Sequence, residues 1–254
     1  MRRGAAMTAA IAGRNLMLVR RMPSVFIPSM VMPLFILIAT AGAFAGVSAL
    51  PALDGVSYLA FTVPMAALMG GAFAGTNSGI TLARDIETGF VDRLIASPAP
   101  RLSIIAGPLV AALARSVFTT TLILTAGAIG GSTPPSVLAA AVLYLMAAFF
   151  CVAGGCWAIG VALRAGTVQA APLMTVVIFI SIFSSVMYAP REAMDGWLRA
   201  IADRNPVTYL LEAARDAHLD NVTWDGFWPG VVAGALLIVV LGAWAMTGLR
   251  RLAR

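Results

Sequence analysis

The chain has 254 residues, of which 60% are hydrophobic and 11% are charged, and its formal net charge is +6. Its mean hydropathy of +0.92 lies far above that of a soluble globular domain, which excludes a soluble enzyme or binding domain. All 17 of its lysine and arginine residues are arginine. Without lysine these residues cannot form a phosphate-binding loop of the Gly-Lys type, and they cannot form a Schiff base with a substrate. Another chain must therefore bind any ATP that is used.

The apolar stretches predict an all-α integral membrane protein. They lack the alternating pattern of an outer-membrane barrel, so their backbone hydrogen bonds in lipid must form within helices. Six spans are predicted, each near the roughly 20 residues that cross a bilayer. They cover about residues 25–46, 58–82, 104–130, 137–163, 168–188 and 230–248. The first span begins too late and is too long for a cleaved signal peptide.

The N-terminal segment, residues 1–24, is predicted to form an interfacial helix. It carries Arg14, Arg20 and Arg21 among apolar residues and no acid. Such a helix lies in the headgroup plane, where each arginine near an anionic surface contributes about 1 kcal/mol. The alternative is that these charges only set the topology of the spans.

Residues 82–101, LARDIETGFVDRLIASPAPR, place three acids and three arginines between two apolar spans. Asp85 and Glu87 suit the positive end of a helical turn. An apolar stripe at helical spacing follows, made of Phe90, Val91, Leu94 and Ile95. The helix must stop before Pro98. The pattern predicts a short amphipathic helix that docks a partner at the membrane surface; the alternative is a solvated loop whose charges keep it out of lipid.

The third span contains a charged residue, Arg115. A charge at the bilayer centre costs about 2.5–3.5 kcal/mol and normally faces protein or water. In one interpretation the span begins near Arg115 and residues 102–114 lie at the membrane surface. In the other, Arg115 lies on the translocation path or at the dimer seam.

Two further features of the spans are interpreted as packing. The motif GAFAG occurs at residues 42–46 and 71–75 and lets helices approach closely. Cys151 and Cys156 lie five apart in one span without a second cysteine pair, so neither a disulfide framework nor a metal site is indicated.

The outer connection, residues 189–228, is predicted to contain two short amphipathic helices. Met194, Trp197, Leu198 and Ile201 occupy one helical face. Asn205 is a candidate N-cap with Pro206 at the first helical position, and an apolar face continues at Val207, Leu210, Leu211 and Ala214.

The distribution of arginine predicts that both termini are cytoplasmic. With that orientation most arginines lie on the cytoplasmic side, in agreement with an even number of spans. The far side then holds most of the acids and four arginines, Arg191, Arg199, Arg204 and Arg215.

Two segments resemble ABC-2 type transporter permeases. RDIETGFVDRLIASPAPRLSIIAG, residues 84–107, is similar to the cytoplasmic segment after the second span of that family, where an acid, a Gly and a Leu precede S/T-P-x-x-R. NPVTYLLEAARD, residues 205–216, resembles the outer segment before the last span, which begins with Asn-Pro and carries an acid and an Arg. The resemblance covers residues 1–254 as one transmembrane domain and is greatest to the daunorubicin-resistance type of drug-export permease.

The resemblance implies partners and residue roles. Such permeases act as two copies, identical or related, with two copies of an ABC ATPase subunit that binds ATP and Mg²⁺; no cofactor is expected in this chain, and no nucleic acid partner. The residues that would couple to the ATPase are Asp85, Glu87, Thr88, Gly89, Asp92 and Arg93. Phe90 and Leu94 would hold the helix to its own membrane domain.

At the other side of the membrane the resemblance implies an outer gate. Its candidate residues are Asn205, Pro206, Tyr209, Glu212 and Arg215. The alternative is a surface cap without a role in transport. Arg115 would lie on the translocation path or at the dimer seam.

The implied function is export of a hydrophobic or amphipathic compound, such as a drug, lipid or glycolipid, across a bacterial plasma membrane. One alternative is a secondary transporter, but no predicted span contains the acid that usually couples ions. The other is an intramembrane enzyme, because residues 75–79 resemble the serine motif of rhomboid proteases. Ser78 and the single histidine, His218, would then lie on opposite sides of roughly 30 Å of bilayer.

Overall fold

The computed structural model describes residues 2–21, 23–44, 46, 56–96 and 100–252. Within these ranges the chain is α-helical and contains no strand, so the all-α prediction is confirmed. The α-helices are α1 Arg2–Arg21, α2 Pro23–Ala43, α3 Tyr58–Glu87, α4 Phe90–Ile95, α5 Ser103–Ile129, α6 Val137–Ala165, α7 Ala171–Phe183, α8 Gly196–Ala202, α9 Pro206–His218 and α10 Trp224–Leu252. Two 3₁₀ helices, η3 Val168–Ala170 and η4 Arg191–Ala193, complete the secondary structure.

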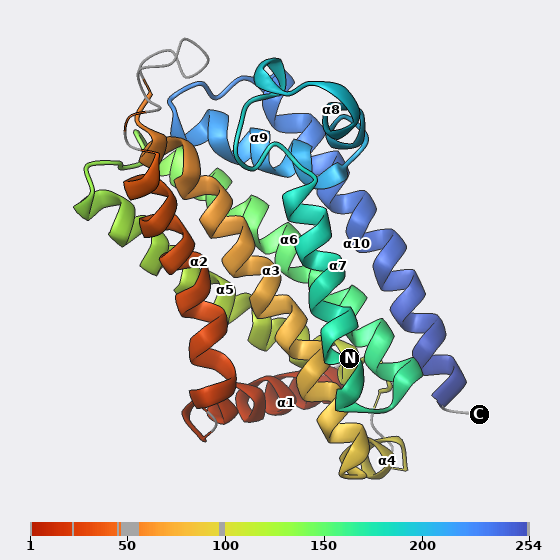
Figure 1. The fold of residues 1–254 in the computed structure, drawn as a ribbon. Coiled ribbons are helices and arrows are strands. Elements are labelled where there is room, and N and C mark those ends of the chain that lie inside the picture. The colour runs from red at the N-terminus through yellow and green to blue at the C-terminus, as the bar shows by residue number, and fades with distance from the viewer. Residues whose placement is uncertain (1, 22, 45, 47–55, 97–99, 253–254) are drawn as a thin grey trace.

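The helices form an upright bundle with short elements at both ends (Figure 1). Helix α1 lies across one end of the bundle beside α4, and α10 also finishes there; we call this the α4 end. Helices α8 and α9 cover the opposite end, which we call the α9 end. The first and the last helix therefore finish at the same end, as the predicted topology requires.

Four helices, α3, α5, α6 and α10, are long and apolar enough to cross a membrane. Shorter apolar helical stretches occupy Ser29–Ala43 in α2 and Val168–Phe183 in η3 and α7. The predicted fifth span, residues 168–188, is therefore too long, because α7 ends at Phe183. Serine hydroxyls end this helix: Ser184 donates to the carbonyl of Ile180 and Ser185 to that of Ile182. The count of six spans stays a prediction.

Several helix boundaries follow from local capping. Ser57 and Ser136 accept hydrogen bonds from the backbone N–H groups of Ala60 and Ala139 at the starts of α3 and α6. Helix α6 ends at Gly166, whose φ of 67° is a left-handed conformation that glycine adopts without strain.

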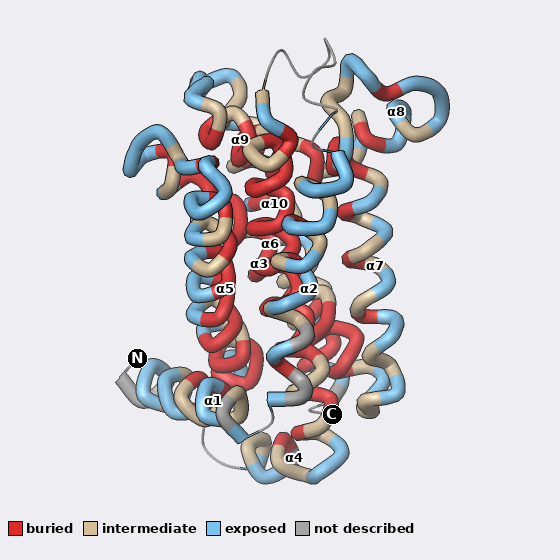
Figure 2. Tube along the Cα trace, turned by 60° about the vertical axis from the view of Figure 1, so that its left-hand side comes forward, coloured by how far each residue is buried: buried red, intermediate tan, exposed pale blue. Residues whose placement is uncertain are grey.

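Helix α3 lies at the centre of the bundle and packs tightly against α6. The face of α3 with Gly71, Gly75 and Gly79 touches the backbone of α6, and a Cβ at any of these positions would overlap backbone atoms there. Figure 2 shows α3 and α6 in the buried interior, whereas α2 and α7 expose much of their surface. The packing interpretation of GAFAG is thus confirmed for residues 71–75. For residues 42–46 the described part of the chain shows no such packing, since a Cβ at Gly42 or Gly46 meets no described atom within 4 Å.

Helix α5 is continuous from Ser103 to Ile129 and places Arg115 in its middle. The interpretation that the third span begins near Arg115 is therefore wrong. Helix α1 packs across the start of α5, where Ile11 rests on Gly107. An unbroken helix spans about 40 Å over these 27 residues, enough to cross the bilayer with Arg115 buried inside the bundle.

Candidate functional site

Helix α4 is the predicted docking helix, and it is connected to α3 by a single tight turn. Helix α3 ends at Glu87, and Gly89 turns the chain with a φ of 66° before α4 begins at Phe90. Within the described chain a Cβ at Gly89 would meet nothing closer than 3.9 Å, so the backbone conformation favours glycine here and packing inside the chain does not require it. Helix α4 ends at Ile95, before Pro98; the Pro-rich exit at 97–99 lies outside the described residues.

The apolar side of α4 anchors it to the bundle. Val91 is buried, and Leu94 and Ile95 pack against a cluster that includes Leu82 and Ile105. Asp92 and Arg93 are exposed on the other side, and Arg93 Nε donates to the carbonyl of Gly89 within its own turn. The helix is therefore amphipathic, with a charged face turned away from the bundle.

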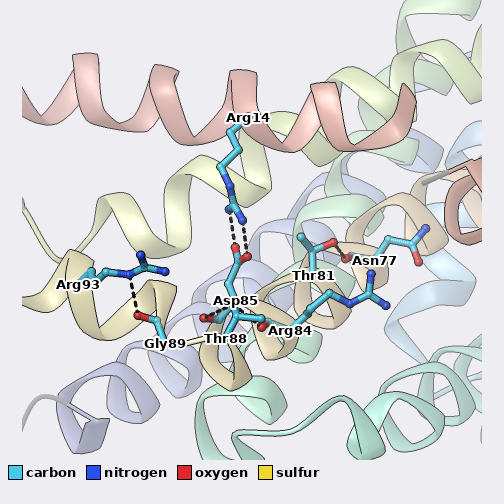
Figure 3. A network of polar contacts seen from close by, with 8 residues as sticks. All are labelled: Arg14, Asn77, Thr81, Arg84, Asp85, Thr88, Gly89 and Arg93. Carbon is cyan, nitrogen blue, oxygen red and sulfur yellow. Dashed lines mark hydrogen bonds and ion pairs between the residues drawn. The ribbon is translucent and has the colours of Figure 1, made fainter. Parts of the chain in front are cut away.

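Asp85 faces the bundle and not the outer surface. Its carboxylate accepts two hydrogen bonds from the Arg14 guanidinium of α1, at 2.5 and 2.7 Å (Figure 3). The same guanidinium lies 4.0 Å from the ring centroid of Phe90 in α4. The bond to Asp85 raises the pKa of Arg14, so this guanidinium is charged at every physiological pH. Arg14 thereby joins α1, α3 and α4, a role that sequence reasoning missed because its partner lies 71 positions away.

Glu87 is exposed, but it too binds within its own chain. Its Oε1 accepts hydrogen bonds from the Thr167 hydroxyl at 2.6 Å and from the Val168 N–H at 2.8 Å. These bonds, the one from Thr167 foremost, lower the pKa of Glu87. Thr88, also exposed, donates to the carbonyl of Arg84. Of the six predicted coupling residues, Asp92 and Arg93 thus have charged groups directed away from other helices.

The predicted outer residues lie together on and before α9. Asn205 caps the helix as predicted: its Oδ1 accepts from the Val207 N–H at 3.0 Å, and Pro206 occupies the first turn. The Asn205 amide also donates to the Ser181 carbonyl at 2.7 Å and to Ser184 Oγ at 3.1 Å. Asn205 therefore ties the start of α9 to the end of α7.

Glu212 and Tyr209 belong to a second group, centred on Arg191 of η4. Arg191 donates to both oxygens of Glu212, at 2.5 and 2.8 Å, and this pairing raises its pKa. The Tyr209 hydroxyl donates to the Asp203 carbonyl, and its ring lies 4.9 Å from the Arg191 guanidinium. One cavity of about 360 Å³ is lined by Arg191, Tyr209, Glu212 and Arg215. Asn205 and Pro206 are not part of its lining.

Arg215 is buried beneath this group and holds backbone carbonyls. Its Nε donates to Phe61 of α3 at 3.2 Å, and its Nη2 donates to Val186 at 2.9 Å and Met187 at 3.4 Å. The guanidinium carbon lies 3.6 Å from the Phe61 ring centroid. Desolvation lowers the pKa of Arg215 to about 10, so it stays charged at neutral pH. Arg215 joins α9 to α3 and to the residues that follow α7, at the α9 end of the bundle.

Arg115 is buried inside the bundle, and its place on a translocation path or at a dimer seam stays a prediction. Only 6% of it is exposed, and its Nη2 donates to the Ala74 carbonyl at 3.2 Å and to Ser78 Oγ at 3.4 Å. Its Nε finds no hydrogen-bond partner among the described residues. The Phe26 ring of α2 lies 5.3 Å away. Arg115 therefore contacts α3 and lies beside α2. No carboxylate among the described residues pairs with its guanidinium.

The two residues considered for an intramembrane enzyme are far apart. Ser78 bonds to the Pro108 carbonyl near the start of α5, whereas His218 Nε2 lies 2.8 Å from Ser132 Oγ beyond its end. Along α5 these points are roughly 30 Å apart. The Ser132–His218 pair, which sequence reasoning missed, is buried on both sides, and no acid in the described chain contacts His218 Nδ1.

A groove lies between α2, α3 and α7. It has a volume of about 280 Å³ and is lined by Ser29, Met32, Phe73, Thr76, Asn77, Thr175 and Phe179. Asn77 crosses from α3 to Ser29 of α2 with a hydrogen bond of 2.8 Å. The lining combines aromatic rings with amides and hydroxyls midway along the helices, which suits an amphipathic ligand. The sequence offered one sign of this groove, namely the polar residues Thr76, Asn77 and Thr175 inside apolar helices.

Comparison with known proteins agrees with this architecture. Residues 7–219 match the ABC-2 type transporter family. The putative transport permease ycf38 of Pyropia yezoensis is 26% identical over 91% of this chain and 82% of its own length. The daunorubicin resistance ABC transporter permease protein DrrB1 of Streptomyces coeruleorubidus is 28% identical over 90% of this chain and 78% of its own. The chain belongs to the ABC-2 type transporter family.

Proposed function

We propose that this transporter permease subunit forms the membrane part of an ATP-driven exporter, with ATP and Mg²⁺ bound by a separate ATPase subunit. The observation that carries the proposal is α4, a helix anchored by Val91 whose charged residues Asp92 and Arg93 project from one end of the bundle. A charged, partly apolar surface helix of this kind suits a protein partner. The lysine-free sequence supplies no phosphate-binding loop of its own.

The proposed cargo is a hydrophobic or amphipathic compound, such as a drug, lipid or glycolipid. The groove between α2, α3 and α7 supports this class, because Phe73 and Phe179 offer apolar surface beside the polar Asn77. The drug-resistance permease among the relatives is consistent with it. Export would use the cap of α8 and α9 as the outer gate.

The proposed location is a bacterial plasma membrane with the α4 end in the cytoplasm. The α4 end carries Arg14, Arg84, Arg93, Arg250 and Arg251, as the positive-inside rule expects of a cytoplasmic face. Single cysteines at Arg93 and at Asp220, with Cys151 and Cys156 replaced, should then label from opposite sides with an impermeant thiol reagent. Outside labelling of both would contradict this topology.

A second copy of the permease, identical or related, and two ATPase copies would complete the transporter. The exposed apolar sides of α2 and α7, with Phe35, Ile38 and Ile180, flank the groove and are the proposed contact with the second copy. The arrangement would enclose a path between the two grooves.

The test is reconstitution with a candidate ABC ATPase subunit. We expect co-purification of the two proteins and ATP-dependent transport of daunorubicin into inside-out proteoliposomes. Asp92→Arg with Arg93→Asp should abolish co-purification, because the exposed charges would repel their partner surface. Arg250→Asp, an exposed arginine at the same end on α10, is the matched control and should keep it. Transport driven by an ion gradient without ATP would overturn the proposal in favour of a secondary transporter.

A further inference from the structure

Two acids at the end of α3 face different elements of their own chain. Asp85 pairs with Arg14 of α1, while Glu87 accepts hydrogen bonds from Thr167 and Val168 at the start of η3. Two positions along a helix turn by about 200°, so the two carboxylates must point in nearly opposite directions. Ile86 between them packs into the buried cluster at the α4 end. The end of α3 is therefore held on two sides by two separate polar links.

Each link leads to one wall of the groove. The α1 helix ends at Arg21, and α2 begins at Pro23, while η3 runs into α7 without a break. Helices α2 and α7 provide Ser29 and Thr175 to the groove whose third wall is α3. The three helices that line the groove are thus connected at the α4 end through Asp85 and Glu87.

The packing of these walls is uneven. Helix α3 is locked to α6 by backbone contact at Gly75 and Gly79, which leaves no room for sliding. Helices α2 and α7 lack such contacts and expose large side chains, among them Phe35 and Ile180. A displacement at the α4 end therefore moves α2 and α7 more easily than α3 and α6.

Arg14 connects this arrangement to α4 directly. Its guanidinium pairs with Asp85 (Figure 3). The same group lies over the ring of Phe90, the first residue of α4. The carboxylate side chain is 9% exposed and the guanidinium side chain 34%, so the pair is half shielded from water. A bidentate arginine–carboxylate pair fixes orientation as well as distance. Motion of α4 is thereby passed to α1 through Arg14.

We propose that Arg14, Asp85 and Glu87 are positioning residues that divide the displacement of α4 between the two walls of the groove. Arg14 and Asp85 act on α2 through α1, and Glu87 acts on α7 through η3. The inference rests on the proposed function, because α4 is there the ATPase contact. It reassigns Asp85 and Glu87 from contact with the ATPase to transmission within the permease, and it leaves ATPase contact to Asp92 and Arg93.

The experiment reads the two walls separately. A single cysteine labelled with an environment-sensitive fluorophore is placed at Phe35 on α2 or at Ile180 on α7, with Val239 on α10 as the control position; all three side chains are exposed in the single chain. Because Phe35 and Ile180 belong to the proposed contact with the second copy, each labelled parent must first transport like the unlabelled protein. Cys151 and Cys156 are replaced by alanine. The reconstituted complex with its ATPase is then followed on addition of ATP, in the parent and in each variant.

We expect Arg14→Asp to remove the ATP-dependent signal at Phe35 and retain that at Ile180, and Glu87→Ala to do the reverse. Both variants should still bind the ATPase and hydrolyse ATP, but transport should fall by about tenfold or more. The exchanged pair Arg14→Asp with Asp85→Arg should restore the signal at Phe35. This rescue separates loss of the link from failure to fold.

Three results would overturn the inference. Loss of ATPase binding in Glu87→Ala or Asp85→Arg, with binding kept in Asp92→Arg, would make the two acids ATPase contacts after all. Equal loss of both signals in either variant, with folding intact, would show that the links are not separate. Unchanged signals would show that they transmit nothing. Failure of the proposed function is distinguishable, since the parent itself would then show no ATPase binding and no ATP-dependent signal.

Discussion

At the α4 end, charged side chains link separate elements one pair at a time, whereas at the α9 end they gather into one cap. Arg14–Asp85 and Glu87–Thr167 each join two elements and remain partly open to water. Arg215, by contrast, is buried and donates to carbonyls in three places, two of them beyond α7 and one in α3. The α4 end is therefore built of independent links, and the α9 end of a shared one.

The difference bears on how each end can move. Breaking one exposed or half-exposed ion pair costs little, since water replaces the partner. Withdrawing Arg215 would leave a buried guanidinium and several carbonyls without partners at once. We therefore expect α9 to move as one body with the ends of α3 and α7 that lie at the α9 end. At the α4 end, by contrast, α1 and the start of α7 should respond individually.

The largest effect should come from Arg215→Ala, which removes the shared link. We expect a loss of stability on the order of 3 kcal/mol, because the carbonyls of Phe61, Val186 and Met187 lose their donor inside the cap. Thermal unfolding of the purified protein in detergent measures it. Arg199→Ala, an exposed arginine of α8, is the control and should melt like the parent. An unchanged melting temperature in Arg215→Ala would mean that the α9 end has no such anchor.

A smaller effect is expected midway between the ends, at Arg115. Arg115→Ala should destabilise the bundle by about 2 kcal/mol through loss of its bonds to Ala74 and Ser78. Arg115→Lys should be made at normal levels but transport less, because an ammonium group lacks the planar face that lies beside Phe26. Expression level and daunorubicin transport test this pair. Parent-like transport in Arg115→Ala would remove Arg115 from the functional residues.

Gly89→Ala should cost about 1 kcal/mol, because alanine is strained at a φ of 66° although nothing obstructs its Cβ. Asparagine tolerates this conformation better than alanine, so the melting temperature of Gly89→Asn should lie closer to that of the parent. If only the size of the side chain mattered, the larger asparagine would destabilise the protein more than alanine. Melting temperature and ATPase co-purification of the two variants decide between these orders. A greater loss in Gly89→Asn than in Gly89→Ala would favour close approach of a partner backbone.

The smallest effect at neutral pH concerns His218 at the α9 end. Burial lowers its pKa from 6.5 to about 4, so the unfolded chain binds more protons between these values. Stability should consequently fall as the pH drops from about 6.5 to 4 and be unaffected by this group above 7. Melting temperature against pH for the parent and His218→Gln measures the contribution. Identical slopes between pH 4 and 6.5 would contradict a buried neutral histidine beside Ser132.

Local patterns determined much of this protein. Hydropathy and the lack of alternation gave helices that cross a membrane, Asn205 with Pro206 predicted the start of α9, and the stripe after Gly89 predicted α4. These features depend on neighbours within one or two turns. The family motifs lie in the same short segments, which is why the match to ABC-2 type transporters could be anticipated from them.

Only the tertiary structure decided which side chains meet. Asp85 and Glu87 were expected to contact the ATPase, and that expectation stays untested. Within this chain they lie on opposite sides of a helix and bind residues 71 and 80 positions away. The two GAFAG motifs are identical in sequence, yet the one at 71–75 packs on α6 and Gly42 stands open. Hydropathy reports that a helix is apolar and not which helix lies beside it. Contacts between distant segments depend on the packing of whole helices, which no local pattern contains.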